Sequence, residues 1–480
     1  MQYTPRVATL SRAMPHLLEA QHGRGLFLWF LLGSGVLVLA VLEFPSASLA
    51  VASVIALASV LKFVGKSLVS PVLLVSGGLL IVAVAGYILY PALENIPHAA
   101  GIRMPADPDI LAEGFWALTC ASLATSIGAL AVVLFTKRPT ASLHMGVLHI
   151  RRKLRVLLVF ATAVPTAMLI GVRGIDNLLE RGTYLPEDSA GGFGGALSLA
   201  GIVSMVICGY LLHTERRVAW LFVLVNVMAF TTLMLSTGSR RFAAIPVLLA
   251  IGYYVARHDK VSSRILAMGG VAALFLVPLP LYWRTLDLHG LIPYLKSLDD
   301  YFGADLGLGT AAKTVLISVP LIGSTVNLRF PSGALSTSLD PRTGESAGWY
   351  DIAQSMRLNA FTPTPGVGEL LHHGTTALVV FFLVIGVYLC LLDRHLRELN
   401  TRGHQLIAFA HLGLVTLFLL YVIQYNLRSS VRMLYYSLAL LVAYVIWWRV
   451  VRPLFLRQSL RKFSPCRTTS LPLGRLNTTS

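Results

Sequence analysis

The chain has 480 residues, of which 55% are hydrophobic and only 13% are charged. Its apolar residues come in runs of roughly 15 to 22, about the length of one bilayer crossing, so the sequence predicts an all-α polytopic membrane protein. Four cysteines without CxxC or Cys/His ligand spacing argue against a disulfide framework and a zinc site.

Windowed hydropathy predicts about twelve transmembrane helices. Although "SASLA" after the first apolar run resembles a signal-peptidase site, a hydrophobic hairpin follows at once and favours an uncleaved first span. The spans are predicted near Leu26–Leu42, Ala47–Leu61, Leu68–Tyr90, Phe115–Phe135, Val156–Val172, Ala196–Leu212, Val218–Leu235, Phe242–Val255, Ile265–Tyr282, Thr375–Leu392, Leu406–Gln424 and Met433–Trp448.

The formal charge of +17 sorts by the side of the membrane. With both termini in the cytoplasm, the inward segments hold two-thirds of the 39 lysines and arginines, whereas most of the 22 acidic residues face outward. This is the positive-inside rule, so the charge excess gives no reason to expect nucleic acid as a partner. The basic segments are topology signals, with anionic lipid as the alternative ligand.

This topology divides the chain into five segments and predicts a multi-pass protein of the cytoplasmic (inner) membrane. Residues 283–371 form one large extracytoplasmic loop between spans nine and ten, which is long for a connection without a function. We therefore expect the substrate site there. The others are a cytoplasmic segment 1–25, spans one to nine in 26–282, spans ten to twelve in 372–450, and a basic tail 451–480.

Five arginines stand at the outward ends of late spans, against the positive-inside tendency. Arginine offers a planar, permanently charged fork that suits phosphate, so the group is a candidate site for a lipid diphosphate. The alternative is that each arginine reaches to the interface as an anchor. The five are Arg240, Arg241, Arg284, Arg428 and Arg432.

A second group lies in "TPTPGVGELLHHGTTALVV", where the large loop leads into span ten. On a helix, Glu369 shares a face with His372 or His373, and a carboxylate or imidazole there is suited to take a proton from an attacking hydroxyl. The alternative is an interfacial acid and two polar histidines without a chemical role.

The sequence contains no motif for several other kinds of chemistry. The chain has no Walker A loop, GxSxG or HExxH motif, and no predicted span holds an acidic residue well inside it, which argues against an ion-coupled transporter. Two acidic pairs, Asp107 with Asp109 and Asp299 with Asp300, are candidate ligands for Mg²⁺ or Mn²⁺, although such pairs arise easily by chance.

Two stretches resemble a known family. "STGSRRFAAIPVLLAIGYYV" and "PGVGELLHHGTTALVVFFLVIGVYL" are similar to motifs of bacterial O-antigen and exopolysaccharide repeat-unit polymerases of the Wzy type, and the large outer loop between them also fits. The resemblance covers roughly Val218 to Leu392 as motif and the remainder only as topology. The family often has an asparagine or aromatic residue where this chain has "HH".

The resemblance implies a fold of the glycosyltransferase C type and transfer of a glycan from polyprenyl diphosphate to an incoming lipid-linked repeat unit, without metal or other cofactor. Arg240 would hold diphosphate or sugar, and Glu369 would be the acid or base. Implied partners are the lipid-linked oligosaccharide, membrane lipids, and flippase and chain-length regulator proteins. His372, His373 and the other four arginines rest on chemistry and topology rather than on the family pattern.

Three alternatives remain open. An O-antigen ligase shares the architecture and the donor but transfers to a lipid A core. A metal-dependent glycosyltransferase would need Asp107 and Asp109, although such enzymes place their acidic motif in the first outward loop, where this chain has only Glu43. A flippase or transporter of lipid-linked sugars also suits twelve spans.

Overall fold

The computed structural model describes residues 46–63, 70–96, 104–136, 152–183, 193–215, 218–257, 260–283, 286–303, 308–359, 362–402 and 404–451. The predicted segment 1–25, the predicted first span Leu26–Leu42 and nearly all of the predicted tail lie outside these residues.

The described residues are mostly α-helical. The first half of the chain forms α2 (Ser46–Phe63), α3 (Pro71–Leu89), η1 (Pro91–Leu93), α4 (Pro108–Phe135), α5 (Arg152–Arg173), α6 (Ile175–Leu179), α7 (Phe193–Thr214) and α8 (Val218–Ser236). There follow η2 (Arg240–Ala244), α9 (Ile245–Arg257), α10 (Lys260–Leu276), α11 (Leu279–Trp283), α12 (Leu291–Gly303), α13 (Leu308–Leu316), α14 (Ser318–Ser324) and η3 (Thr325–Asn327).

The remaining elements are α15 (Ala334–Leu339), α16 (Trp349–Ala353), β1 (Arg357–Asn359), β2 (Thr362–Pro363), α17 (Gly366–His372), α18 (Thr375–Thr401), α19 (Gln405–Gln424), α20 (Leu427–Ile446) and the π-helical turn η4 (Trp447–Val451). The strands β1 and β2 pair antiparallel.

Nine helical segments among the described residues are long and apolar enough to cross a membrane. Eight of them coincide with predicted spans, namely α3, α4, α5, α7, α8, α18, α19 and α20. Three other predicted spans correspond to shorter apolar helices in α2, α9 and α10. A mostly helical chain with membrane-length helices is thereby confirmed.

The ninth segment, Gly309–Asn327, lies inside the predicted outer loop. It is not one continuous helix, because α13 ends at Leu316 and α14 begins at Ser318. In α13, Lys313 Nζ donates to the carbonyls of Glu94 and Ile96, both at 2.6 Å. In α14, Val319 lies against Gly86 near the end of α3 and against Gly114 near the start of α4. Both halves thus contact the same end of the α3–α4 pair.

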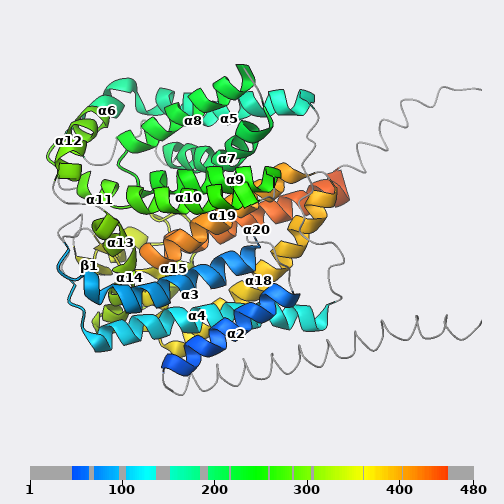
Figure 1. Cartoon of the computed structure of the whole chain (residues 1–480). Helices are drawn as coiled ribbons and strands as arrows, with labels where there is room; N and C mark the ends of the chain where they lie inside the picture. Colours follow the sequence, from blue (N-terminus) through cyan, green and yellow to red (C-terminus); the bar gives the residue numbers. More distant parts are fainter. Residues whose placement is uncertain are drawn as a thin grey trace, which may run out of the picture. The chain divides into compact units, whose positions relative to one another are not determined.

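Two helices carry most of the packing in the first part of the chain. The helix α4 contacts α2, α3, α14 and α18, and α7 contacts α5, α8, α9 and α19 (Figure 1). A Cβ at Gly128 in α4 would lie 2.2 Å from the Leu383 carbonyl oxygen of α18, so only glycine allows this approach. Small residues at helix contacts are expected in membranes, where backbones approach closely.

The start of α4 shows why this helix begins where it does. Pro108 occupies its first turn, where a missing N–H costs no hydrogen bond. The Asp107 side chain accepts from the backbone N–H of Asp109 at 2.9 Å, as an N-cap does. This contact gives Asp107 a structural role and leaves its pairing with Asp109 as a metal site without support.

The helix α18 extends well beyond the predicted span, which ended at Leu392. Its additional turns bury Asp393 and Arg397, whose Oδ2 and Nη2 lie 2.7 Å apart. Residues four apart share a helix face, so the two charges neutralise each other within one helix and allow it to continue.

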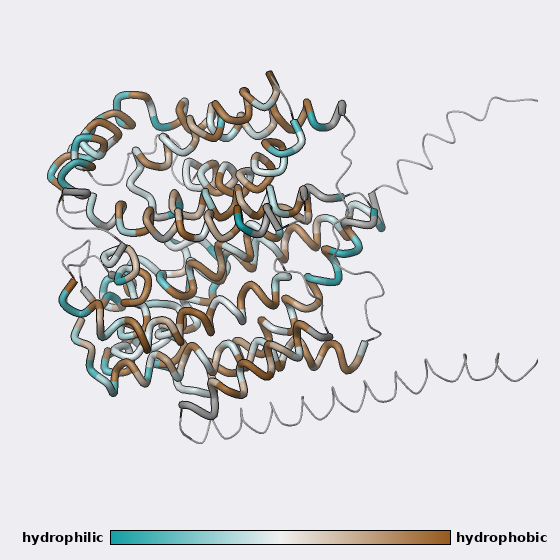
Figure 2. Tube along the Cα trace, in the orientation of Figure 1, coloured by the Kyte–Doolittle hydropathy of each residue, from teal (hydrophilic) through white to brown (hydrophobic). Residues whose placement is uncertain are grey.

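The chain divides into two units, Met1–Tyr435 and Tyr436–Ser480. The described part of the second unit is the later part of α20 with η4, and its exposed side chains include Val442, Val445 and Trp447. Along the helices of the first unit, hydrophobic residues dominate, and hydrophilic residues gather at helix ends and connections (Figure 2).

Candidate functional site

The motif "PGVGELLHHG" folds into the short helix α17 and the turn after it. Gly366 N–H donates to the Tyr425 carbonyl at 2.8 Å, which ties the start of α17 to the end of α19. A Cβ at Gly368 would lie 2.7 Å from Thr325 Cγ2, and Thr325 Oγ1 donates to the Gly368 carbonyl at 3.0 Å. Gly374 adopts φ +100°, a conformation that favours glycine, and separates α17 from α18.

Glu369 is completely buried, with 0% of its surface exposed. Its Oε2 accepts a hydrogen bond from the backbone N–H of Leu427, the first residue of α20, at 3.2 Å. Burial raises the pKa of Glu369 to about 7, and the Ser338 hydroxyl and the Leu427 N–H oppose this shift only in part. Its Oε1 is also buried and has no hydrogen-bond partner among the described residues. Glu369 therefore joins α17 to the start of α20.

His372 is only partly buried, and its ring has a defined partner. Its Nδ1 lies 3.3 Å from the Thr325 carbonyl oxygen. A carbonyl oxygen only accepts, so Nδ1 carries the proton and the neutral ring keeps its lone pair on Nε2. The ring also packs on Phe330, with centroids 4.1 Å apart. This tautomer is the one that a general base acting through Nε2 requires.

His373 lies beside His372, with ring centroids 5.4 Å apart, and edge-on to Phe330. Its Nε2 is buried and has no hydrogen-bond partner among the described residues. Burial, with a smaller contribution from His372, lowers the pKa of His373. His373 is therefore a neutral neighbour, and of the two histidines His372 has the geometry for proton transfer.

The Arg428 side chain is bonded to backbone carbonyls of the protein itself. Only 2% of the surface of Arg428 is exposed. Its guanidinium donates to the Thr337 carbonyl and, at 2.6 Å, to the Arg342 carbonyl. It also lies 5.7 Å from the centroid of the Trp349 ring, within cation–π range. Arg428 therefore anchors α15 and the loop after it, through backbone carbonyls rather than at the lipid interface.

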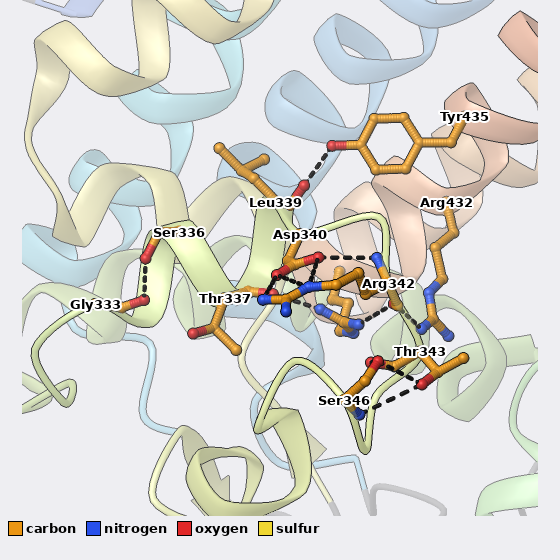
Figure 3. Close-up of polar contacts among 11 residues, drawn as sticks. Gly333, Ser336, Thr337, Leu339, Asp340, Arg342, Thr343, Ser346, Arg432 and Tyr435 are labelled. Atoms are coloured by element: carbon orange, nitrogen blue, oxygen red, sulfur yellow. Dashed lines mark hydrogen bonds and ion pairs between the residues drawn. The ribbon is translucent and has the colours of Figure 1, made fainter.

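Arg432 and Tyr435 extend this anchor by one and two further turns of α20. Arg432 Nη2 donates to the Arg342 carbonyl at 3.2 Å, and the Tyr435 hydroxyl donates to the Leu339 carbonyl (Figure 3). Arg432 is partly exposed and uses only one of its donors in this contact. Arg432 thus keeps donors that an anion can reach, whereas Arg428 is almost completely buried.

The anchored loop presents a charged pair to solvent. Arg342 pairs with Asp340 through Nε and Nη2, with Nη2 at 2.6 Å from Oδ2 (Figure 3). Two-thirds of the Arg342 side chain is exposed. Hydrogen bonding to Arg342 lowers the pKa of Asp340 to about 2, so this carboxylate stays ionised and keeps the arginine engaged.

Arg240 and Arg241 begin the helical turn η2, directly after α8. Ser239 caps this turn, since its hydroxyl accepts from the Arg241 N–H at 3.4 Å, and Gly238 adopts φ +61°. The Arg241 side chain hydrogen-bonds Tyr421 near the end of α19. The side chain of Arg240 and all of Arg284 lie outside the described residues.

The end of α19 thus connects two of the predicted groups. Tyr421 bonds Arg241, and one turn later the Tyr425 carbonyl accepts from Gly366 at the start of α17. The structure therefore brings Arg241 and the Glu369 helix to the same helix end, although 128 positions separate these two residues in the chain.

Several polar residues of this region were not selected from the sequence. Arg173 and Arg181 are both buried cations near the end of α5 and in the turn after α6. The sequence did offer a signal for them, because both follow predicted span five on the outward side, where arginine is as unexpected as at the five selected positions. Ser338 and Thr325 carried no comparable signal, since uncharged polar residues are frequent in the predicted outer loop, and Tyr435 lies inside predicted span twelve.

Among the described residues, no group of three or more His, Cys, Asp or Glu side chains is arranged to hold a metal ion. Comparison of the chain with protein-family models, with curated proteins and with solved structures found no match.

Proposed function

We propose that the protein is a glycosyltransferase of the Wzy type, which polymerises polyprenyl-diphosphate-linked oligosaccharide repeats into O-antigen, capsule or exopolysaccharide at the outer face of the cytoplasmic membrane. The observation that carries the proposal is the His372 ring, whose Nδ1 is held by the Thr325 carbonyl and whose Nε2 is thereby the proton acceptor. It sits in a helix that is tied to the same end of α19 as Arg241.

The loop contacts support twelve spans with one large outer loop. If Gly309–Asn327 crossed the membrane, its two ends would lie about 30 Å apart along the membrane normal. Lys313 instead binds carbonyls just after α3, and Val319 packs near the start of α4. We therefore regard α13 and α14 as a broken helix that stays at the outer ends of α3 and α4, and Trp283 to Leu371 as one outer segment.

In the proposed reaction, His372 Nε2 removes the proton from a hydroxyl of the incoming repeat. The freed oxygen attacks the anomeric carbon of the donor glycan, and the bond between that carbon and the diphosphate oxygen breaks. The electron pair leaves with polyprenyl diphosphate, whose charge Arg240, Arg241 and Arg284 stabilise, with Arg432 as a further donor. The proton on His372 passes to water or to the departing diphosphate.

These roles differ from the expectations in two respects. Glu369 changes from the preferred base to a positioning group, because its carboxyl is completely buried and bonded to Leu427 N–H. Arg428 changes from a diphosphate ligand to the anchor of the loop that carries Asp340 and Arg342. The remaining partners of the proposal are membrane lipids, a flippase that delivers the repeats and a chain-length regulator.

The proposal is tested in cells that depend on the protein for polymer. We expect Arg240→Ala and His372→Ala each to abolish long chains and to leave single lipid-linked repeats, since loss of a positioned general base typically costs 10²–10⁴ in rate. Glycan chain length on gels measures the outcome. Arg264→Ala, an exposed position at the predicted cytoplasmic side, is the control and should retain normal polymer.

Normal-length polymer from a well-expressed Arg240→Ala or His372→Ala protein would contradict the proposal. Long free lipid-linked chains in cells that lack the protein would identify it as a ligase instead.

A further inference from the structure

Arg181 joins the end of α8, which precedes Arg240 and Arg241, to the described segment that follows Arg284 in the chain. It follows the short helix α6 and is only 8% exposed. Its Nη1 donates to the Asn177 carbonyl at 3.0 Å and to the Ser236 carbonyl at 2.9 Å. Ser236 is the last residue of α8, and Arg240 follows it by four positions.

The backbone of Arg181 binds the second segment. Its N–H donates to the His289 carbonyl at 2.8 Å, and the His289 N–H donates back to the Arg181 carbonyl at 2.9 Å. The approach is close enough that a Cβ at Gly290 would lie 2.6 Å from the Leu179 carbonyl oxygen, and Gly290 has φ +118°. Arg284 precedes His289 by five positions in the chain.

This side of the junction is packed tightly. The Trp283 ring stacks on Tyr294 with centroids 4.6 Å apart, and the Tyr294 hydroxyl lies 3.1 Å from His289 Nδ1. Trp283 and Tyr294 are both completely buried. His289, which Arg181 binds through its backbone, is therefore held by Tyr294, which in turn stacks on Trp283.

The guanidinium meets α8 at the point where the helix leaves carbonyls without intrahelical partners. A cation at a helix C-terminus is favourable because the last carbonyls carry partial negative charge. The next residues, Thr237 to Ser239, form the tight turn that leads into η2. By holding the Ser236 carbonyl, Arg181 therefore sets the position at which η2 begins with Arg240 and Arg241.

We propose that Arg181 is a positioning residue for polyprenyl diphosphate, which sets the spacing between the turn carrying Arg240 and Arg241 and the segment following Arg284. This inference rests on the proposed function. It adds a residue that touches neither the lipid nor the sugar and that acts through the Ser236 carbonyl and the His289 backbone.

The test measures the affinity of the full-length protein in nanodiscs for polyprenyl diphosphate, with polyprenyl monophosphate as a second probe. We expect Arg181→Gln to weaken diphosphate binding about tenfold while monophosphate binding changes less, because the spacing of several arginines matters for two phosphates. Arg181→Lys keeps the positive charge and one of the two carbonyl contacts, and should weaken diphosphate binding about threefold.

Arg155 is the matched control. Its Nη1 donates to the Thr214 carbonyl at 3.3 Å and pairs with the Glu215 carboxylate at 3.0 Å. Thr214, like Ser236, is the last residue of a helix. Arg155→Gln therefore removes a similar helix-end contact at the predicted cytoplasmic side. Its diphosphate affinity should equal that of the wild type.

The outcomes separate the two proposals. Wild-type affinity in Arg181→Gln, together with lost affinity in Arg240→Ala, would overturn the positioning role and leave the proposed function standing. If Arg181→Gln does not fold, an Arg181→Lys protein that binds polyprenyl diphosphate as tightly as the wild type would also overturn the positioning role. Absence of diphosphate binding by the wild-type protein would overturn the proposed function and this inference with it.

Discussion

At the scale of single residues, the charge state of Glu369 is the feature with the clearest measurable consequence. Burial raises its pKa to about 7, above the ordinary value of 4.5 that applies when the chain is unfolded. A raised pKa means that the folded protein binds more protons than the unfolded chain between these two values. The contribution of Glu369 to stability is therefore fully present below pH 4.5 and is lost as pH rises through 7.

We predict that the wild-type protein loses stability relative to Glu369→Gln as pH rises from 5 to 8. Glutamine keeps a carbonyl oxygen for the Leu427 N–H but has no charge to bury. The difference should reach about 3 kcal/mol, since each pKa unit corresponds to about 1.4 kcal/mol. Thermal unfolding of both proteins in detergent across this pH range measures it.

A constant difference between the two melting curves across pH would contradict this prediction, because it would mean that Glu369 does not titrate in the range. Asp340→Asn serves as the control, since hydrogen bonding to Arg342 lowers the pKa of Asp340 to about 2 and its carboxylate stays ionised over the same pH values.

The sequence alone identified Glu369, His372 and His373 as one group, because their spacing on a short helix is a local property. It did not predict what Arg428 binds. That contact joins Arg428 to Thr337, 91 positions earlier in the chain, and to the carbonyl of Arg342. Backbone carbonyls leave no mark in a sequence, so an arginine that anchors a loop looks the same as one that binds a ligand.

At the scale of helices, α4 and α18 approach each other closely through their backbones. A Cβ at Gly128 would lie 2.2 Å from the Leu383 carbonyl oxygen, and one at Gly386 would lie 2.1 Å from the Thr125 carbonyl oxygen. The two glycines thus allow each backbone to meet the other, and helix association in a membrane depends on such packing.

We predict that Gly128→Leu destabilises the protein by more than about 3 kcal/mol, above the usual range for overpacking, because backbone rather than a flexible side chain must move. The fraction of protein that stays monodisperse after solubilisation and its thermal unfolding temperature measure the effect. Gly171→Leu in α5, where a Cβ meets nothing within 4 Å, should remain close to wild type. Equal stability of both variants would contradict the close packing.

Hydropathy found most helices because a run of apolar residues is a strong signal. It placed the end of span ten at Leu392, whereas α18 runs to Thr401, since Asp393 and Arg397 neutralise each other on one face. It also did not predict a membrane-length apolar segment at Gly309–Asn327, where Lys313 and scattered polar residues lower the hydropathy. In both cases a charged side chain is paired, with an opposite charge in α18 and with backbone carbonyls in α13. An average of hydropathy over a window does not register such pairing.

At the scale of the whole molecule, the position of Gly309–Asn327 decides the topology. If this segment stays outside, Val326, which is 47% exposed, and the exposed loop residue Glu345 lie on the same side of the membrane. We predict that cysteines introduced as Val326→Cys and Glu345→Cys both react with an impermeant maleimide added from outside.

Labelling is interpretable because the native Cys120, Cys208 and Cys390 are buried and Cys466 can be replaced. Arg264→Cys, at the predicted cytoplasmic side, should react only after the membrane is permeabilised. Val326→Cys that behaves like Arg264→Cys would place α14 across the membrane and contradict a single outer segment from Trp283 to Leu371.

As proposed, the protein lengthens a glycan on a polyprenyl diphosphate. The most direct measurement reconstitutes the purified protein into liposomes with lipid-linked repeats extracted from cells that lack it, without nucleotide or ion gradient. We predict a ladder of longer lipid-linked glycans with release of one polyprenyl diphosphate per added repeat, and loss of this ladder in Arg240→Ala and His372→Ala. Movement of repeats across the bilayer without any growth in chain length would contradict it and identify a transporter.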